Sequence, residues 1–538
     1  MSKRILSLIL ALCMVGILCS FAHAEGVASL LHPYEETVQV TIMGIDEKDN
    51  AVVYDSSKHD RASANENAWI DAYRDLLNIE VTRITPEDSE ALSANLNTMM
   101  AGGELPDIMI VSKDMFYVLA ENGVLRDVKA DFDAYDGELW NEIKNSYTPD
   151  VWATGMYEGE MLGIPNAQNF YNCTGVLWVR QDWLDALGLS VPTTLDEMEA
   201  VAQAFVDNKM GGEETIGIGM VNMDAWDLYC SAFGSILAAY GVPIDTWVQT
   251  EDGQYVFSNT LPAVKDGLLR MQEMYKKGLM KKDFAVTTVN EEDVSNGKCG
   301  MYTAPGWHSV TAIHANIMSD EKADWTAARI PTLDGNYVTQ TTNATVDSFI
   351  VVNANYEHPD VIFRMKELEH YVRCYAASSD PLYSLFRTTD EFQMWNLMVF
   401  RGLQRGDVDL KQSQMAVEAF EKGLTVDEAP EFIKSIYLKI LDAVNGLRDM
   451  EGNRLVYLVS YPIVSDIVEK GYVKAGYNGP LTENMNLYQK TIDASLLSAM
   501  AKVVMGDDAS VFDKAVEDWY ANGGQAITDD VNAYYASK

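Results

Sequence analysis

The sequence predicts an α/β protein with at least two domains, and three observations lead to this prediction. Residues 25–538, which follow an N-terminal leader, are too many for one hydrophobic core. Strand and helix patterns alternate between residues 38 and 123, and a separate strand–helix region begins near residue 170. Hydrophobic residues make up 48% of the chain, which indicates a globular rather than a disordered protein.

The leader has the pattern of a secretory signal peptide. A basic segment, Lys3–Arg4, is followed by the uncharged apolar run Ile5–Phe21, and Ala22–Ala24 places small residues where a signal peptidase cleaves. A membrane anchor is the alternative, and the run is at the lower end of the roughly 17–25 residues that span a bilayer. The cleavage motif directly after the run favours removal, with a mature chain that starts at Glu25.

A lipid anchor would require a cysteine preceded by a small residue. Leu12 precedes Cys13 and Leu18 precedes Cys19, so the usual attachment motif is missing. No second apolar run of membrane length follows. We therefore expect an exported protein that is soluble, and that is extracellular or associated with the cell surface.

The charge balance excludes some partners. Eighty acidic and 40 basic residues give a net charge of −40, which repels nucleic acid and anionic lipid. Neither is expected to bind.

Four cysteines follow the leader, and they form no CxxC motif: Cys173, Cys230, Cys299 and Cys374. An exported protein can hold one or two disulfides, and the sequence does not choose among three pairings. Buried free thiols are the alternative.

The region after the leader alternates strand and helix. Strands are expected over 38–45, 79–84 and 107–111, and helices over 66–77, 89–100 and 113–122. This order predicts a parallel sheet covered by helices on both faces. Ligands of such sheets bind beyond the carboxyl ends of the strands, which lead here into loops at 46–65, 85–88 and 112–117.

The second region begins with a predicted strand over 174–180 and a short helix over 181–187. Thr194 and Glu197 form a capping box that starts a helix running to about Asn208. A further helix over 262–277 has proline in its first turn and ends at a glycine. From about residue 360 the chain is expected to be mostly helical.

Three groups of motifs occur in order along the chain. The stretch 157–197 contains Gly163-Ile-Pro, Asn169-Phe-Tyr-Asn, Arg180-Gln-Asp-Trp-Leu and Val191-Pro-Thr-Thr-Leu-Asp-Glu. A second group runs from Asp252-Gly to Gly306-Trp, and a third comprises Met505-Gly-Asp, Trp519 and Gly523-Gly. Together they resemble family-1 extracellular solute-binding proteins of ABC sugar importers, the maltose-binding-protein class, and especially its long Gram-positive forms.

The resemblance implies a type II periplasmic-binding-protein fold, in which hinge strands join two α/β lobes and the ligand cleft lies between them. The chain would cross near 165–171 and return near 345–349. Lobe 1 would comprise residues 25–168 plus about 347–450, and lobe 2 would comprise 169–346 plus about 451–538. Closure about such hinges is a known mode of domain motion.

The function implied by the resemblance is capture of a carbohydrate, expected to be an oligosaccharide, and its delivery to the membrane permease of an ABC importer. The chain would act as a monomer, without a cofactor and without catalysis. One alternative is a secreted glycoside hydrolase, because such enzymes need only two carboxylates. Another is a binder of peptides or other small solutes, because fold does not fix function.

Sugars present an apolar C–H face and an edge of hydroxyls, so their sites need aromatic rings beside polar side chains. Trp307 follows Pro305-Gly, where the family often places a ligand-stacking tryptophan, and a core role is the alternative. The other candidates are Asn169 and Tyr171 at the first crossing, Trp226 in lobe 2, Lys113, Asp114 and Tyr117 after a strand end, and Asp347 at the return crossing. Hinge, capping or packing roles are the alternatives for these residues.

Many relatives carry a calcium loop after the helix that begins at the capping box. Residues 207–214 occupy that place here, and Lys209 falls where calcium needs an oxygen ligand. We therefore expect no metal at this loop.

We predict that the exported chain starts at Glu25, because the cleavage motif ends at Ala24. Intact-mass measurement of protein secreted from an expressing bacterium tests this. A mass that includes residues 1–24, or a lipid on Cys13 or Cys19, would contradict it.

Overall fold

The computed structural model describes residues 30–45, 63–147, 149–167, 171–172, 174–221, 232–287, 291–342, 346, 348–376, 380–386, 388–389, 392–475, 477, 479 and 482–537. The chain divides into two compact units. Unit 1 comprises Met1–Gln168 and Val346–Gly406, and unit 2 comprises Asn169–Thr345 and Asp407–Lys538. The predicted leader, Cys173 and Cys230 lie outside the described residues.

Unit 1 is built on a five-stranded sheet with the strand order β2-β1-β3-β13-β6. Its strands are β1 (Val38–Met43), β2 (Ile79–Ile84), β3 (Ile108–Ser112), β6 (Ile164–Pro165) and β13 (Ser348–Val352). The predicted parallel pairing is confirmed for β1, which pairs in parallel with β2 and β3. The return strand β13 runs antiparallel to both β3 and β6, so the sheet is mixed rather than wholly parallel.

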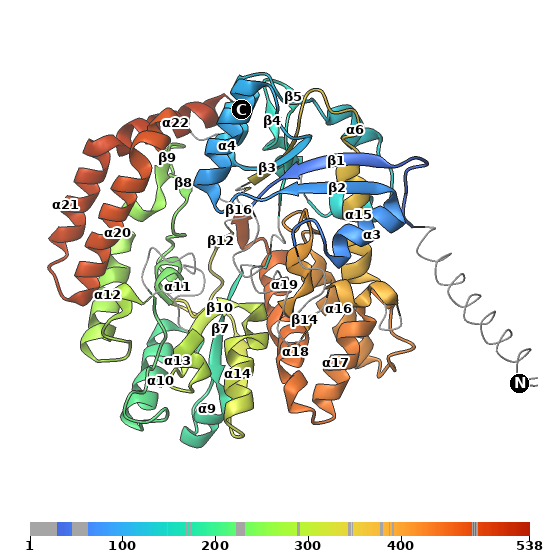
Figure 1. The fold of residues 1–538 in the computed structure, drawn as a ribbon. Coiled ribbons are helices and arrows are strands. Elements are labelled where there is room, and N and C mark those ends of the chain that lie inside the picture. Colours follow the sequence, from blue (N-terminus) through green and yellow to red (C-terminus); the bar gives the residue numbers. More distant parts are fainter. Residues whose placement is uncertain are drawn as a thin grey trace, which may run out of the picture. The chain divides into compact units, whose positions relative to one another are not determined.

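The helices of unit 1 follow the predicted alternation. They include α3 (Ala68–Leu77), α4 (Ser89–Gly102), α5 (Lys113–Glu121) and α15 (Val361–Cys374). Figure 1 shows β1 and β2 side by side, with α3 in the connection between them. Asn67 caps α3 and Asp88 caps α4, each accepting backbone N–H groups that have no partner inside the helix.

Unit 2 has a smaller sheet with the order β10-β7-β11. Its strands are β7 (Gly175–Arg180), β10 (Met301–Pro305) and β11 (Trp325–Ala328), and the two outer strands β10 and β11 both pair antiparallel with the central β7. Successive residues of β7 point to opposite faces, and they supply two different cores. Val176 and Trp178 pack into one core, while Leu177 and Val179 pack into the other.

The second of these cores is covered by helices from distant parts of the chain. They are α9 (Gln181–Leu187), α10 (Leu195–Asp207), α12 (Ala263–Lys276), α20 (Lys490–Met505), α21 (Ser510–Trp519) and α22 (Gln525–Ala536). The capping box of Thr194 and Glu197 is confirmed at the start of α10. Trp183 is also confirmed as a core residue, since 3% of it is exposed.

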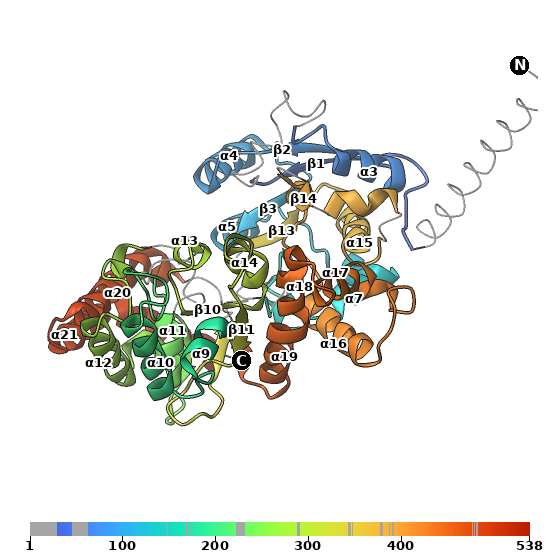
Figure 2. The ribbon, with the colours of Figure 1, turned by 90° about the horizontal axis from the view of Figure 1, so that it is seen from below.

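The first core is closed by later helices, which Figure 2 shows as a group. They are α16 (Val408–Glu421), α18 (Glu451–Leu455) and α19 (Tyr461–Glu469), with a π-helical turn at Val456–Ser460, and α17 (Lys434–Val444) packs against α18. Leu410, Leu455 and Tyr461 belong to the same buried cluster as Val176 of β7. The chain therefore enters unit 2 at residue 407, earlier than the expected boundary near 450, because these helices bury their apolar side chains there.

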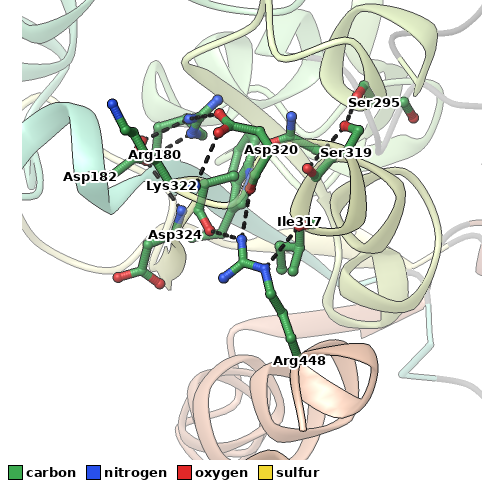
Figure 3. A network of polar contacts seen from close by, with 12 residues as sticks. Arg180, Asp182, Ser295, Ile317, Ser319, Asp320, Lys322, Asp324 and Arg448 are labelled. Atoms are coloured by element: carbon green, nitrogen blue, oxygen red, sulfur yellow. Dashed lines mark hydrogen bonds and ion pairs between the residues drawn. The ribbon is translucent and has the colours of Figure 1, made fainter. Parts of the chain in front are cut away.

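An arginine network ties this later segment to unit 2 (Figure 3). The exposed Arg448 donates hydrogen bonds to the carbonyl oxygens of Ile317, Asp320 and Ala323 at 2.7–3.0 Å, at the end of α14 (Ala312–Ser319). The carboxylate of Asp320 lies 3.3 Å from the guanidinium of Arg180. One residue therefore joins both arginines.

Arg180 is the buried member of the network. Its side chain is 2% exposed, it donates two hydrogen bonds to Asp182, and its guanidinium lies 4.6 Å from the ring centre of Trp183. A buried cation requires such pairing, because a buried charge without an opposite charge beside it is strongly destabilising.

The two arginines predict different stability losses. Arg180→Ala should lower the free energy of unfolding by about 3 kcal/mol, because it empties a buried position and strips Asp182 of its partner. Arg448→Ala should cost only about 1 kcal/mol, because the carbonyl groups it leaves can bind water. Urea unfolding of both variants tests this, and equal losses would contradict the assignment of Arg180 as the structural anchor.

Candidate functional site

The candidate site in unit 2 is built around Trp307, which lies in the 3-10 turn Gly306–Val310 directly after β10. The half-buried indole donates from Nε1 to the carbonyl oxygen of Asn172 at 3.0 Å. The ring of His308 lies 4.4 Å from the indole, between centroids. The tryptophan is therefore fixed at its polar edge and supported by a neighbouring ring.

The turn that carries Tyr171 and Asn172 is held from two sides. Thr174 N–H donates to the carbonyl oxygen of Tyr171 at 3.1 Å, which closes the turn. Tyr461 donates its hydroxyl to Oδ1 of Asn172 at 2.7 Å. The two donors, Trp307 and Tyr461, use different oxygens of Asn172, so they fix the turn together.

Two further tyrosines and two carboxylates complete the group, which we call the Trp307 cluster: Tyr171, Asn172, Trp307, His308, Asp407, Asp409, Tyr457 and Tyr461. The rings of Tyr457 and Tyr461 are stacked, with centroids 6.4 Å apart. The hydroxyl of Tyr461 lies 3.4 Å from Oδ2 of Asp409. Both aspartates are half-buried, at the start of α16.

Burial sets the protonation of this cluster. Desolvation lowers the pKa of His308 to about 4, so its imidazole is neutral at pH 7. Burial, and then the charge of Asp407, raises the pKa of Tyr171, so its phenol keeps its proton. The cluster thus combines neutral rings and hydroxyl groups with two carboxylates, and it contains no lysine or arginine.

In unit 1, three predicted residues share the first two turns of α5. Ser112 caps this helix through a 3.4 Å hydrogen bond from Met115 N–H, and Lys113, Asp114 and Tyr117 follow. Asp114 is exposed, while Lys113 and Tyr117 are half-buried. The ring of Tyr117 lies 6.2 Å from that of Tyr157, between centroids.

The predicted residues therefore form two sets. Trp307 and Tyr171 come together in unit 2, and Lys113, Asp114 and Tyr117 lie on one helix of unit 1. Asn169, Trp226 and Asp347 lie outside the described residues. The ligand roles of all eight stay predictions.

Four residues of the cluster were not predicted. Asp407 and Asp409 fall in the range up to about 450 that was expected in the other lobe, whereas Tyr457 and Tyr461 fall in the expected lobe but carry no binding motif. A signal was present, since Tyr457 and Tyr461 are spaced by four residues, as side chains on one helical face are. Only the packing of the later helices within unit 2 shows that the helical face with Tyr457 and Tyr461 lies toward Asn172.

Metal and thiol chemistry have little support in the part of the chain that the structure describes. No group of three or more His, Cys, Asp or Glu side chains there could hold a metal ion. Lys209 pairs with Glu213 at 2.7 Å in the loop where relatives carry calcium, and the absence of calcium stays a prediction. Cys299 and Cys374 are buried free thiols, which confirms that alternative for these two cysteines.

Comparison with known proteins identifies the class. The model of the bacterial extracellular solute-binding protein family matches residues 62–365, and the chain belongs to this family. Lipoprotein LipO of Bacillus subtilis is 23% identical over 479 residues, covering 85% of this chain and 86% of that protein. The polygalacturonan/rhamnogalacturonan-binding protein YtcQ of the same organism is 25% identical over 442 residues, covering 80% and 81%.

Solved structures establish the fold. The alginate-binding protein AlgQ2 aligns with a TM-score of 0.57 at 14% identity, covering 94% of this chain and 99% of that protein. The substrate-binding protein FusA of S. pneumoniae, solved with kestose, also aligns with a TM-score of 0.57 at 14% identity, covering 93% and 100%. The expected type II periplasmic-binding-protein fold is thereby confirmed. Throughout the described ranges, every helix is too short or too polar to cross a membrane.

The buried His308 predicts a specific loss of stability in acid. Its pKa is about 4 in the folded chain and about 6.5 in the unfolded chain, so the unfolded state binds the proton first as the pH falls. This contribution is complete above pH 6.5 and is lost by about pH 4, with a maximum of about 3 kcal/mol. Urea unfolding at pH 7.5 and 4.5 should show a larger acid-induced loss for the native protein than for His308→Gln. Equal losses would contradict the neutral buried state of His308.

Proposed function

We propose that the protein captures a carbohydrate, with Trp307 as the aromatic platform of its site. The observation that carries this proposal is the half-buried indole of Trp307, which is fixed by the hydrogen bond from its Nε1 to the carbonyl oxygen of Asn172. Because this bond uses the edge of the indole, the ring face can serve as an apolar surface. A rigid ring loses little conformational entropy on binding, and its face matches the C–H face of a sugar.

The polar members of the cluster suit hydroxyl groups. Tyr171 can donate a hydrogen bond, and the carboxylates of Asp407 and Asp409 can accept hydrogen bonds from sugar hydroxyls. Among the relatives, YtcQ is named for binding polygalacturonan and rhamnogalacturonan, and FusA for fructooligosaccharide transport. These names support a carbohydrate ligand for this chain.

We further propose that the ligand is a neutral oligosaccharide. Polygalacturonan carries carboxylates, and the net charge of −40 of this chain opposes their approach. A neutral chain of hexose or pentose units meets no such repulsion.

We propose that the protein acts outside the cytoplasm after removal of residues 1–24 and delivers its ligand to the permease of an ABC importer, and its membership of the extracellular solute-binding protein family supports both proposals. We propose that the protein binds without catalysis and works as a monomer. Lys113, Asp114 and Tyr117 of unit 1 are proposed as further ligand contacts, together with Asn169, Trp226 and Asp347.

We predict that Trp307→Ala weakens binding of the cognate oligosaccharide at least fivefold, because an aromatic platform contributes about 1–3 kcal/mol. A thermal-shift screen of neutral and uronic oligosaccharides identifies the ligand, and calorimetry then measures affinity. Trp307→Phe should lose less, since it keeps an apolar ring and gives up only the bond to Asn172.

Trp152→Phe is the matched control, because it too removes an indole bond to a backbone carbonyl, that of Lys144 at 3.1 Å in unit 1. Its affinity should be unchanged. The site assignment fails if Trp307→Ala binds as tightly as the native protein, and release of reducing sugar would contradict binding without catalysis.

A further inference from the structure

A hairpin and the last helix of unit 2 are joined by one asparagine. The strands β8 (Trp247–Gln249) and β9 (Tyr255–Phe257) are antiparallel, with Gln249 opposite Tyr255. Asn532 of α22 accepts a hydrogen bond from Tyr255 N–H at 2.8 Å and donates one to the carbonyl oxygen of Tyr255 at 2.9 Å. The asparagine side chain thus pairs with the open edge of β9, and Figure 1 shows α22 beside this strand.

Two tyrosine rings reinforce the same junction. The rings of Tyr255 and Tyr535 are stacked, with centroids 3.8 Å apart and planes 10° from parallel. Tyr477 and Tyr534 meet Tyr535 edge-on, at 6.0 and 5.3 Å between centroids. The junction is therefore a preformed aromatic surface rather than a loose chain terminus.

A hollow of about 530 Å³ lies at this junction. Its polar lining comes from Gln249, Gln254, Asn532 and the two stacked tyrosines, and glycine and alanine supply the rest. This volume is within the range of about 300–1,000 Å³ that is usual for small-molecule sites. None of the lining residues is charged, although the chain has 80 acidic residues.

The side-chain amides have hydrogen-bonding capacity left for a ligand. Gln249 Nε2 donates to the carbonyl oxygen of Gly253 at 3.1 Å, and its Oε1 can accept a hydrogen bond. Within the described residues, the exposed amide of Gln254 has no hydrogen-bond partner. Burial raises the pKa of Tyr535 to about 12, so its hydroxyl stays protonated.

We propose that this hollow is a second carbohydrate-binding site, which holds neutral sugar units of a polysaccharide. Amide groups pair with adjacent hydroxyls, and the tyrosine rings offer apolar faces to sugar C–H groups. The hollow shares no residue with the Trp307 cluster. It would hold a glycan chain at the protein surface, independently of oligosaccharide capture at Trp307.

Affinity electrophoresis tests the proposal with the full mature chain in native gels that contain soluble starch, inulin or galactomannan. At least one polysaccharide should retard the native protein and Trp307→Ala equally. Gln254→Ala should weaken retardation about threefold and Tyr535→Ala about tenfold, as expected for the loss of one amide and of one ring. Gln525→Ala, which removes an exposed glutamine amide from the same helix outside the lining, is the matched control for Gln254→Ala and should behave as the native protein.

The outcomes separate this proposal from the function proposed for Trp307. Gln254→Ala removes an exposed amide without a partner, so it keeps the test valid if Tyr535→Ala unfolds. Absence of retardation in all three gels, or equal retardation of Gln254→Ala and the native protein, overturns the second site. Loss of retardation in Trp307→Ala alone assigns polysaccharide binding to the Trp307 cluster and overturns it as well. Calorimetry with the cognate oligosaccharide reports on Trp307 separately and should be unaffected by Gln254→Ala.

Discussion

The close approach of two backbone segments in unit 2 determines much of this structure. The turn Gly306–Val310 packs on the segment from Gly452 to Tyr461, and a serine on each side bonds to a carbonyl on the other. Ser460 donates to the carbonyl oxygen of Gly306, and Ser309 donates to that of Gly452, each at 2.9 Å. A Cβ atom on Gly306 would lie 2.9 Å from Ser460 Oγ, and one on Gly452 only 2.4 Å from the Ser309 carbonyl oxygen. Only glycine allows this contact at either position.

Two consequences follow from this contact. It places Trp307 and His308 beside Tyr461, so the cluster is assembled from residues 172, 307 and 461 of the sequence. It also assigns the helices after residue 406 to unit 2, where Arg448 and the buried apolar side chains of α16, α18 and α19 fix them further. The site and the division of the chain therefore have one physical cause.

The two proposed binding surfaces of this strongly acidic chain differ in charge, since the Trp307 cluster contains Asp407 and Asp409 whereas the residues that line the hollow at α22 are uncharged. At the Trp307 cluster, burial keeps His308 neutral and Tyr171 protonated. The hollow at α22 is lined by amides, rings and small residues. Neutral rings beside hydroxyl and amide groups suit the C–H faces and hydroxyl groups of uncharged sugars.

Local signals in the sequence were sufficient to predict individual helices and strands, but not to predict how these elements pack against one another. The strand over 79–84, the helix over 181–187 and the capping box at Thr194 were predicted correctly, because each depends on a few neighbouring residues. The antiparallel β13 and the boundary at 406 were not, because both depend on contacts between distant segments. Tyr461 and Asn172, which are 289 residues apart, illustrate this limit. The motif around Trp307 marks that residue as a candidate, whereas Asp409 and Tyr457, which contact Tyr461, carry no motif.

Hydrogen–deuterium exchange, with and without a neutral oligosaccharide that stabilises the protein, tests whether the Trp307 cluster binds carbohydrate. Ligand should slow exchange in three separate segments of unit 2, at residues 171–176, 301–310 and 455–462. Protection there should disappear in Trp307→Ala at the same ligand concentration. Ligand-induced protection that leaves all three segments unchanged would contradict the assignment of the Trp307 cluster as the carbohydrate site.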